Sequence, residues 1–221
     1  MRQFEPKFNP GVDDLSYEEV DKIQQFIVLD HPELFWFKKL MCCDIFGKID
    51  TRFNINIIYR YSKEEAVNTN NRIKPKYESI INEANKCKTD KDKIDLVRER
   101  LMGIGNYSVD KEDNVSDYYN LVSIFDTGNS MCGGFSYGFK FIMDRVGVTS
   151  IAVTDIRQKS SDSHIWNMVK IDGDWYNLDI SFDDSLRDKY HVKEKYYLVD
   201  NDTFYKDHQI NEYLPNLKEK K

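Results

Sequence analysis

An Asp-Gly pair at residues 172–173 constrains the fold of this chain more than any other feature of its sequence. It joins two segments of strand-like composition, residues 163–171 and 174–180. Asp-Gly between such segments is the strongest short-range signal of a β-hairpin. Residues 148–156 have a similar composition and precede the pair. We therefore expect an antiparallel meander of three short strands in the second half of the chain.

One buried helix is predicted ahead of this meander. The segment that begins at Cys132 carries Phe135, Phe139 and Ile142 at helical spacing, and Gly147 is placed to end it. A helix followed by an antiparallel sheet is an α+β arrangement. The sequence thus predicts an α+β fold in which this helix packs on the sheet.

The first half of the chain is predicted to be mostly helical. Ser16 and Glu19 form a capping-box pattern ahead of an apolar helical stripe. A charged segment, residues 62–88, is expected to be helical but interrupted or bent near Pro75. Thr89 is placed to cap the next helix.

A single strand is expected in that half, because polar and apolar residues alternate along residues 54–61. We therefore divide the chain into an N-terminal extension, residues 1–100, and a catalytic core, residues 101–221. The extension is expected to be mostly helical with this one strand, and the core to hold the helix and the meander.

Charge and composition exclude several classes of protein. Lys and Arg number 32 against 38 Asp and Glu, and the net charge of −6 gives no basic surface for nucleic acid. The mean hydropathy is −0.65, and no run of about 18 apolar residues could span a membrane. The 4 cysteines are too few for a disulfide scaffold, and without a Cys-x-x-Cys pair no zinc site is expected.

A thiol at the start of the predicted helix is the candidate nucleophile. Cys132 lies where free N–H groups and the positive end of the helix dipole stabilise a thiolate. Gly133 and Gly134 follow, and their lack of side chains leaves room for a substrate backbone to approach the sulfur. On the local sequence alone, an ordinary buried thiol remains the alternative.

The hairpin supplies two partners for this thiol. If the Asp-Gly pair forms a two-residue turn, Asp179 lies opposite Trp166, and His164 shares a face with Trp166. His164 and Asp179 are then diagonal neighbours, with Cβ atoms roughly 7–8 Å apart. The alternatives are a core histidine and a carboxylate that caps the exit of the hairpin.

A thiol, an imidazole and a carboxylate together form a nucleophilic site. The imidazole takes the proton of the thiol, and the carboxylate holds the ring in the right tautomer and stabilises its charge. The thiolate attacks an acyl carbon to give a thioester, which water or a second amine resolves. Cys132, His164 and Asp179 are therefore the expected catalytic residues.

The motifs around these residues resemble the transglutaminase-like superfamily of papain-like Cys-His-Asp enzymes, and their spacing is similar to that of its bacterial members. The motifs are residues 130–135 (SMCGGF), 163–169 (SHIWNMV) and 172–179 (DGDWYNLD). The resemblance covers about residues 105–208 and includes a closing strand at 196–200. It implies a papain-like core, with Cys132 as nucleophile, His164 as general base and acid, and Asp179 as the orienting group.

The resemblance also implies roles near the nucleophile. The backbone N–H of Cys132 is the expected first oxyanion donor, and Tyr107 is the candidate for the second. Trp166 is expected to wall the cleft beside the histidine, and Trp175 to lie in the core.

The resemblance implies an enzyme that acts on an amide of a peptide or protein, without a cofactor. It is either a cysteine protease or a protein-glutamine acyltransferase, and hydrolysis and crosslinking both stay open. Two alternatives are a catalytically idle peptide-binding or cell-surface adhesion module and a Cys/His/Asp metal site. No pattern in the chain sets an oligomeric state.

Location in the cell also stays open. Residues 1–5 carry no apolar signal region, so a secreted or cell-surface protein would need a signal removed beforehand. Residues 30–36 are similar to N-terminal extensions of bacterial cell-surface members. The adjacent Cys42 and Cys43 favour a reducing compartment instead, although a bond from one of them to Cys87 stays open.

The remaining candidate ligands are expected to be structural. His31, His191 and His208 have no nucleophile or metal partner at a telling spacing, so surface or structural roles are predicted. Asp183 and Asp184 do not match a calcium-binding loop and are expected in a solvated turn.

Overall fold

The structure is a computed structural model that describes most, but not all, residues of the chain. Its contacts divide the chain into two units, Met1–Asn71 and Arg72–Lys221. None of the helices in the described ranges is long and apolar enough to cross a membrane. The described residues are 7–8, 15–41, 44–45, 48–49, 55–107, 119–155, 164–190 and 194–208.

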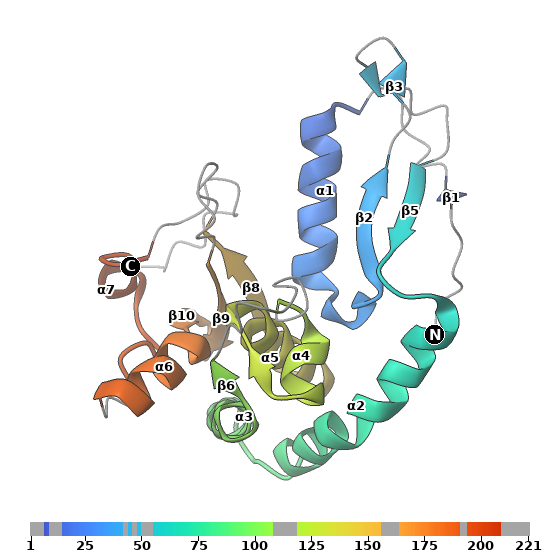
Figure 1. Ribbon diagram of the computed structural model, residues 1–221. Helices are drawn as coiled ribbons and strands as arrows, with labels where there is room; N and C mark the ends of the chain where they lie inside the picture. The colour runs from blue at the N-terminus through green and yellow to red at the C-terminus, as the bar shows by residue number, and fades with distance from the viewer. Residues whose placement is uncertain are drawn as a thin grey trace. The chain divides into compact units, whose positions relative to one another are not determined.

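The first unit consists of one long helix and a three-stranded antiparallel sheet in the order β1-β5-β2 (Figure 1). Val20, Phe37 and Leu40 form its buried core. The sequence pattern predicts only β5 of these strands. The elements are β1 (Lys7–Phe8), α1 (Tyr17–Asp30), the 3-10 turn η1 (Pro32–Leu34), β2 (Phe37–Met41), the short pair β3 (Asp44–Ile45) and β4 (Lys48–Ile49), and β5 (Ile55–Tyr59).

The helix starts follow the predicted caps. The Ser16 hydroxyl accepts from the Glu19 N–H at 3.2 Å, and the Glu19 carboxylate accepts from the Ser16 N–H at 2.7 Å. Thr89 caps α3 (Asp90–Ile104) in the same way. The helix α2 (Lys63–Ala84) runs through Pro75, so of the interruption or bend predicted there, the interruption does not occur.

The second unit contains the predicted meander as a sheet in the order β10-β9-β8, with all pairs antiparallel. The strands are β8 (Ser150–Thr154), β9 (Ile165–Ile171) and β10 (Asp174–Leu178). Asp172 and Gly173 have φ angles of 52° and 101°. Positive φ at both central residues is what a two-residue hairpin turn of this type requires, which is why Asp-Gly predicts it.

The helix α5 (Cys132–Val146) packs on β8 and β9, as expected. Phe135, Phe139 and Ile142 are fully buried, and Gly147 ends the helix in the left-handed conformation with φ 78°. The predicted α+β class is therefore confirmed. The other elements of this unit are β6 (Asn106–Tyr107), α4 (Leu121–Asp126), β7 (Asn129–Ser130), α6 (Ile180–Tyr190) and α7 (Asn201–Phe204).

The closing strand expected at residues 196–200 does not form. Only Val199 pairs with the sheet, through an isolated bridge to Asn177 with backbone bonds of 2.8 and 2.9 Å. The preceding residue, Leu198, has a φ of 51°, which interrupts the extended conformation that a strand needs.

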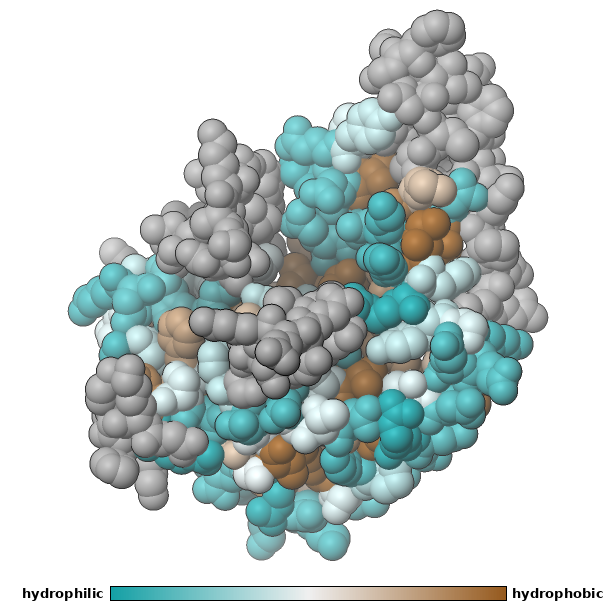
Figure 2. Space-filling model, in the orientation of Figure 1, coloured by the Kyte–Doolittle hydropathy of each residue, from teal (hydrophilic) through white to brown (hydrophobic). Residues whose placement is uncertain are grey.

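Hydrophilic side chains cover most of the visible face of the described chain, and only small hydrophobic patches lie among them (Figure 2). Cys87 is a free, half-buried thiol, and Cys42 and Cys43 lie outside the described residues. The division of the chain into an extension and a catalytic core at residue 100 stays a prediction.

Candidate active site

Asp179 lies where β10 ends and α6 begins. Its backbone carbonyl accepts from the Asp183 N–H at 3.1 Å, so it occupies the N-cap position of α6. Its Oδ1 atom accepts from the Phe182 N–H at 3.0 Å and from the Ser181 hydroxyl at 2.8 Å. One oxygen of the buried carboxylate is thus fixed by the helix that it caps.

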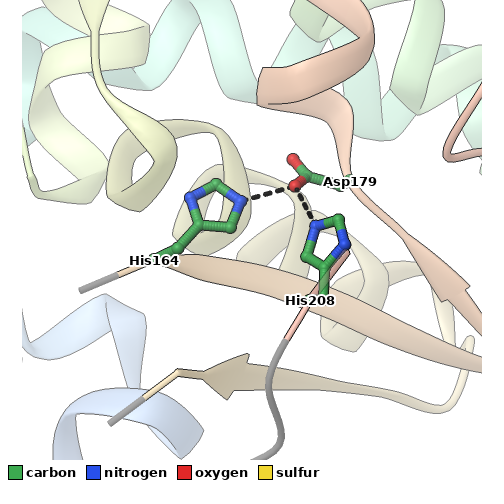
Figure 3. Close-up of side chains that lie close together, drawn as sticks. All are labelled: His164, Asp179 and His208. Atoms are coloured by element: carbon green, nitrogen blue, oxygen red, sulfur yellow. Dashed lines mark hydrogen bonds and ion pairs between the residues drawn. The ribbon is translucent and has the colours of Figure 1, made fainter. Parts of the chain in front are cut away.

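The other carboxylate oxygen meets His164, which lies directly before β9. The distance from Nε2 of His164 to Oδ2 of Asp179 is 2.5 Å (Figure 3). The structure therefore brings the two predicted partners together, and β9 and β10 pair in the predicted register, although Asp179 lies just beyond the last pair. The pairing ends at Leu178 with Asn167, because the chain turns into α6 at the next residue.

The charges of this pair stabilise each other. Burial opposes the charged form of His164, but the Asp179 charge, the hydrogen bond to it and the Cys132 side chain together raise the pKa of His164 to about 10. Burial also opposes the charge of Asp179, yet the two histidines and the Phe182 N–H hold the pKa of that carboxyl well below its usual value. The imidazolium–carboxylate form is thus favoured at neutral pH.

Cys132 is the first residue of α5, as predicted, and its side chain is among the groups that raise the pKa of His164. The N-cap residue Met131 has no side-chain bond to the first turn of the helix. Cys132 is only 2% exposed. The three predicted catalytic residues therefore lie together, with the sulfur on the buried side.

Gly133 and Gly134 do not leave space for a substrate. A Cβ atom on Gly133 would lie 2.5 Å from the Tyr119 carbonyl oxygen, and one on Gly134 would overlap the Ser130 hydroxyl. The two glycines instead let the start of α5 pack tightly against its own chain. This corrects the role predicted for them from sequence.

Trp166 does not have the role expected for it, whereas Trp175 packs against a buried hydrophobic cluster, in line with the prediction. Trp166 is fully buried and donates from its indole N–H to the Asn177 side chain at 3.2 Å, so it does not wall a cleft. Trp175 is partly exposed. The ring that lies flat on His164 is Phe182, with centroids 4.1 Å apart.

His208, after α7, is the site residue that the sequence does not reveal. Its side chain is 2% exposed, and its Nε2 atom lies 3.2 Å from the same Oδ2 atom of Asp179 that binds His164 (Figure 3). Of the surface or structural role predicted for His208, the surface role is therefore wrong. No local pattern could have found this residue, because it meets Asp179 only through the tertiary fold. His31 is exposed, as predicted, and His191 lies outside the described residues.

Tyr107 is half-buried, and Cys132 is among the groups that act on its phenol. Burial, together with the charges of Cys132, Tyr119 and Asp179, raises its pKa to about 12. Its phenol therefore keeps its proton at neutral pH and can donate a hydrogen bond.

Asp183 and Asp184 are buried in α6, so a solvated turn was the wrong expectation. Asp183 accepts from the Arg98 guanidinium at 2.9 Å and from the Tyr196 N–H at 2.9 Å. Asp184 pairs with Arg187 at 2.9 Å. These partners compensate the cost of burying two carboxylates.

A metal ion does not fit the histidine–aspartate cluster in this geometry. The nearest ligand atoms of His164, Asp179 and His208 all lie within 4.8 Å of one another. Two ligands of one tetrahedral zinc ion would lie roughly 3.3 Å apart, because each bond to the metal is about 2.0 Å. The 2.5 Å between His164 and Asp179 is a hydrogen-bond distance instead.

Comparison with protein-family models finds a match in the part of the chain that holds this site. The family model of the transglutaminase-like superfamily matches residues 78–180. No protein with a curated description matches the chain.

Several solved structures are similar to the chain, among them the following two. One is a crystal structure of a TGase, with 15% identity and a TM-score of 0.43 over 81% of this chain and 52% of that one. Another is the periplasmic domain of TgpA from Pseudomonas aeruginosa, with 10% identity and a TM-score of 0.40 over 70% of this chain and 66% of that one. The chain thus spans about half the length of the first structure.

Proposed function

Because residues 78–180 match the family model of the transglutaminase-like superfamily, we propose that the protein is a cysteine-nucleophile acyl-transfer enzyme. Its substrate is an amide of a peptide or protein. Cys132 is the nucleophile, His164 the general base and acid, and Asp179 the group that orients His164.

The observation that carries this proposal is the convergence of the three side chains. His164 bonds to Asp179 through Nε2, and the Cys132 side chain is near enough to raise the pKa of the same ring. The ring can therefore exchange a proton with the sulfur while the carboxylate fixes its tautomer. The raised pKa of His164, about 10, favours a charged ring beside the thiolate.

The reaction follows from these roles. The Cys132 thiolate attacks the amide carbon and forms a C–S bond. Charge develops on the carbonyl oxygen, where the backbone N–H of Cys132 and the phenol of Tyr107 are the proposed donors. The C–N bond then breaks, and His164 gives its proton to the leaving amine. Water or a second amine resolves the thioester and regenerates the thiolate.

Whether the acyl group passes to water or to an amine decides between a protease and a crosslinking enzyme. Incubation with a peptide library and a labelled primary amine, followed by mass spectrometry, separates the two. A gain of mass by the amine indicates transfer, and chain cleavage indicates hydrolysis.

Two variants control this experiment. Cys132→Ala should abolish either product, and Cys87→Ala, which changes the free thiol outside the site, should keep wild-type rates. An unchanged rate for Cys132→Ala on every substrate would rule the proposal out.

The burial of Cys132, at 2% exposure, favours a second candidate. A thiol that no substrate reaches would make this domain a catalytically idle module that binds peptides or adheres to a surface. Such a module would bind peptides without consuming them, and its Cys132 would resist small alkylating reagents.

A further inference from the structure

The buried histidine that the proposed mechanism leaves unused is His208. Both of its ring nitrogens face carboxylates: Nε2 lies 3.2 Å from Asp179 and Nδ1 lies 3.0 Å from Asp207. A carboxylate only accepts hydrogen bonds. A singly protonated ring could therefore satisfy one of these contacts, and a doubly protonated ring donates to both.

Aromatic packing fixes this ring in place. The His208 ring stacks on Phe204, with centroids 3.8 Å apart and planes at 25°. The edges or faces of Tyr196, Trp166 and Phe182 lie at centroid distances of 5.0, 5.3 and 5.3 Å. A ring enclosed in this way has little freedom to rotate away from Asp179.

The bond from His208 completes the support of the Asp179 carboxylate. Its Oδ1 is held by Phe182 and Ser181, and Oδ2 is held by both His164 and His208 (Figure 3). Without His208, the oxygen that orients the proposed catalytic base would keep only one of these two donors in a buried site. A buried charge that lacks a donor is costly, and its side chain shifts to find another.

We propose that His208 is a positioning residue for acyl transfer: it holds Oδ2 of Asp179 where it aligns His164 with Cys132. This inference rests on the proposed function. The ring nitrogens of His208 bond to Asp179 and Asp207. His208 therefore acts on the reaction through Asp179 and not on the substrate.

Two substitutions of His208 separate positioning from packing. His208→Phe keeps an aromatic ring but removes the donor, whereas His208→Gln keeps an N–H near the position of Nε2. We expect His208→Phe to lower kcat by roughly 10- to 100-fold with little change in KM, as the loss of one hydrogen bond to a charged group implies. His208→Gln should recover most of that rate, and His31→Phe, at an exposed histidine, should leave it unchanged.

A second readout does not depend on the substrate. Alkylation of Cys132 by iodoacetamide should move to higher pH in His208→Phe and stay near the wild-type profile in His208→Gln. Folding is checked by near-UV circular dichroism. A folded His208→Phe with wild-type kcat and alkylation profile would overturn the proposal, as would a His208→Gln as impaired as His208→Phe.

A third experiment uses the wild-type protein, so no substitution can disturb its folding. In NMR spectra of protein with labelled histidines, the Nε2 proton of His208 should be protected from exchange and should shift when Cys132 is alkylated. An unprotonated Nε2 on His208 would overturn the proposal. If wild-type Cys132 is inert to alkylation, the proposed function itself fails. Failure of the proposed function can thus be told apart from failure of the role proposed for His208.

Discussion

Nε2 of His164 lies 2.5 Å from Oδ2 of Asp179 in a site where the histidine side chain is 14% exposed and the aspartate is fully buried. A buried charge pair of this kind is strongly coupled, because little water screens it. The contribution of this pair to the stability of the protein should therefore depend on pH more strongly than that of an exposed pair.

Asp179→Asn tests this coupling. The Asn side chain keeps an oxygen that can accept from the Phe182 N–H, so the cap of α6 survives while the charge is lost. The free energy of unfolding should fall by about 3 kcal/mol near pH 5.5, since one partner of a buried pair is removed.

The pH dependence of that loss has a defined sign. The lowered pKa of Asp179 contributes stability above the ordinary value of 3.8, which disappears as the pH falls below it. The raised pKa of His164 contributes stability that is complete below 6.5 and is lost as the pH rises to about 10. Urea unfolding should thus show a larger difference between wild type and Asp179→Asn at pH 5.5 than at pH 9.5. An equal difference at both values would contradict the coupling.

The buried ion pair between Arg98 and Asp183 should contribute to the stability of the protein. Arg98→Met would leave Asp183, which is fully buried, without the guanidinium 2.9 Å away. We expect a loss of about 3–5 kcal/mol in urea unfolding. Arg100→Met, which removes an exposed pair with Glu83, is the matched control and should cost less than about 1 kcal/mol. Equal losses for the two variants would show that the buried pair stabilises the protein no more than the exposed pair does.

Tyr107→Phe tests the proposed oxyanion donor. Removing the phenol should lower kcat by roughly 10²-fold, the usual cost of losing one such donor. The alkylation of Cys132 should stay unchanged, because no oxyanion forms in that reaction. Tyr17→Phe, at an exposed tyrosine of α1, is the control. A wild-type kcat in Tyr107→Phe would remove this residue from the mechanism.

Two glycine-to-alanine substitutions should change the stability of the protein in opposite directions. Gly133→Ala places a methyl group 2.5 Å from a backbone oxygen of Tyr119 and should destabilise the protein by about 1–3 kcal/mol. Gly103→Ala, in α3, meets no atom within 4 Å and should stabilise it by up to about 1 kcal/mol. Thermal unfolding measures both, and a stabilised Gly133→Ala would show that the start of α5 can relax.

The sequence predicts the local structure of the second unit well, because turns and helix ends there depend on the conformational preferences of single residues. Asp172 and Gly173 specify the turn by their backbone conformation, and Gly147 specifies the end of α5. The meeting of His164 with Asp179 and the register of the hairpin were also predictable, although the pairing ends one residue before Asp179. Whether Asp179 continues a strand or caps a helix depends on the residues after it, which the hairpin rule does not consider.

Long-range contacts explain what the sequence does not predict. His208 joins Asp179 through a segment after α7, and Phe182 covers His164 only because α6 follows directly. The burial of Trp166 likewise depends on the packing of Phe204 and Tyr196 against the sheet. These contacts arise from tertiary packing, for which the spacing of residues gives no local signal.

The most direct test of the account is the rate at which iodoacetamide alkylates Cys132 between pH 5 and 9, read peptide by peptide with Cys87 as the internal reference. Pairing with His164 predicts that Cys132 reacts at least about tenfold faster than Cys87 at pH 6, and that His164→Gln removes this advantage. A Cys132 that reacts no faster than Cys87 below pH 7 would contradict the nucleophile on which the proposed function depends.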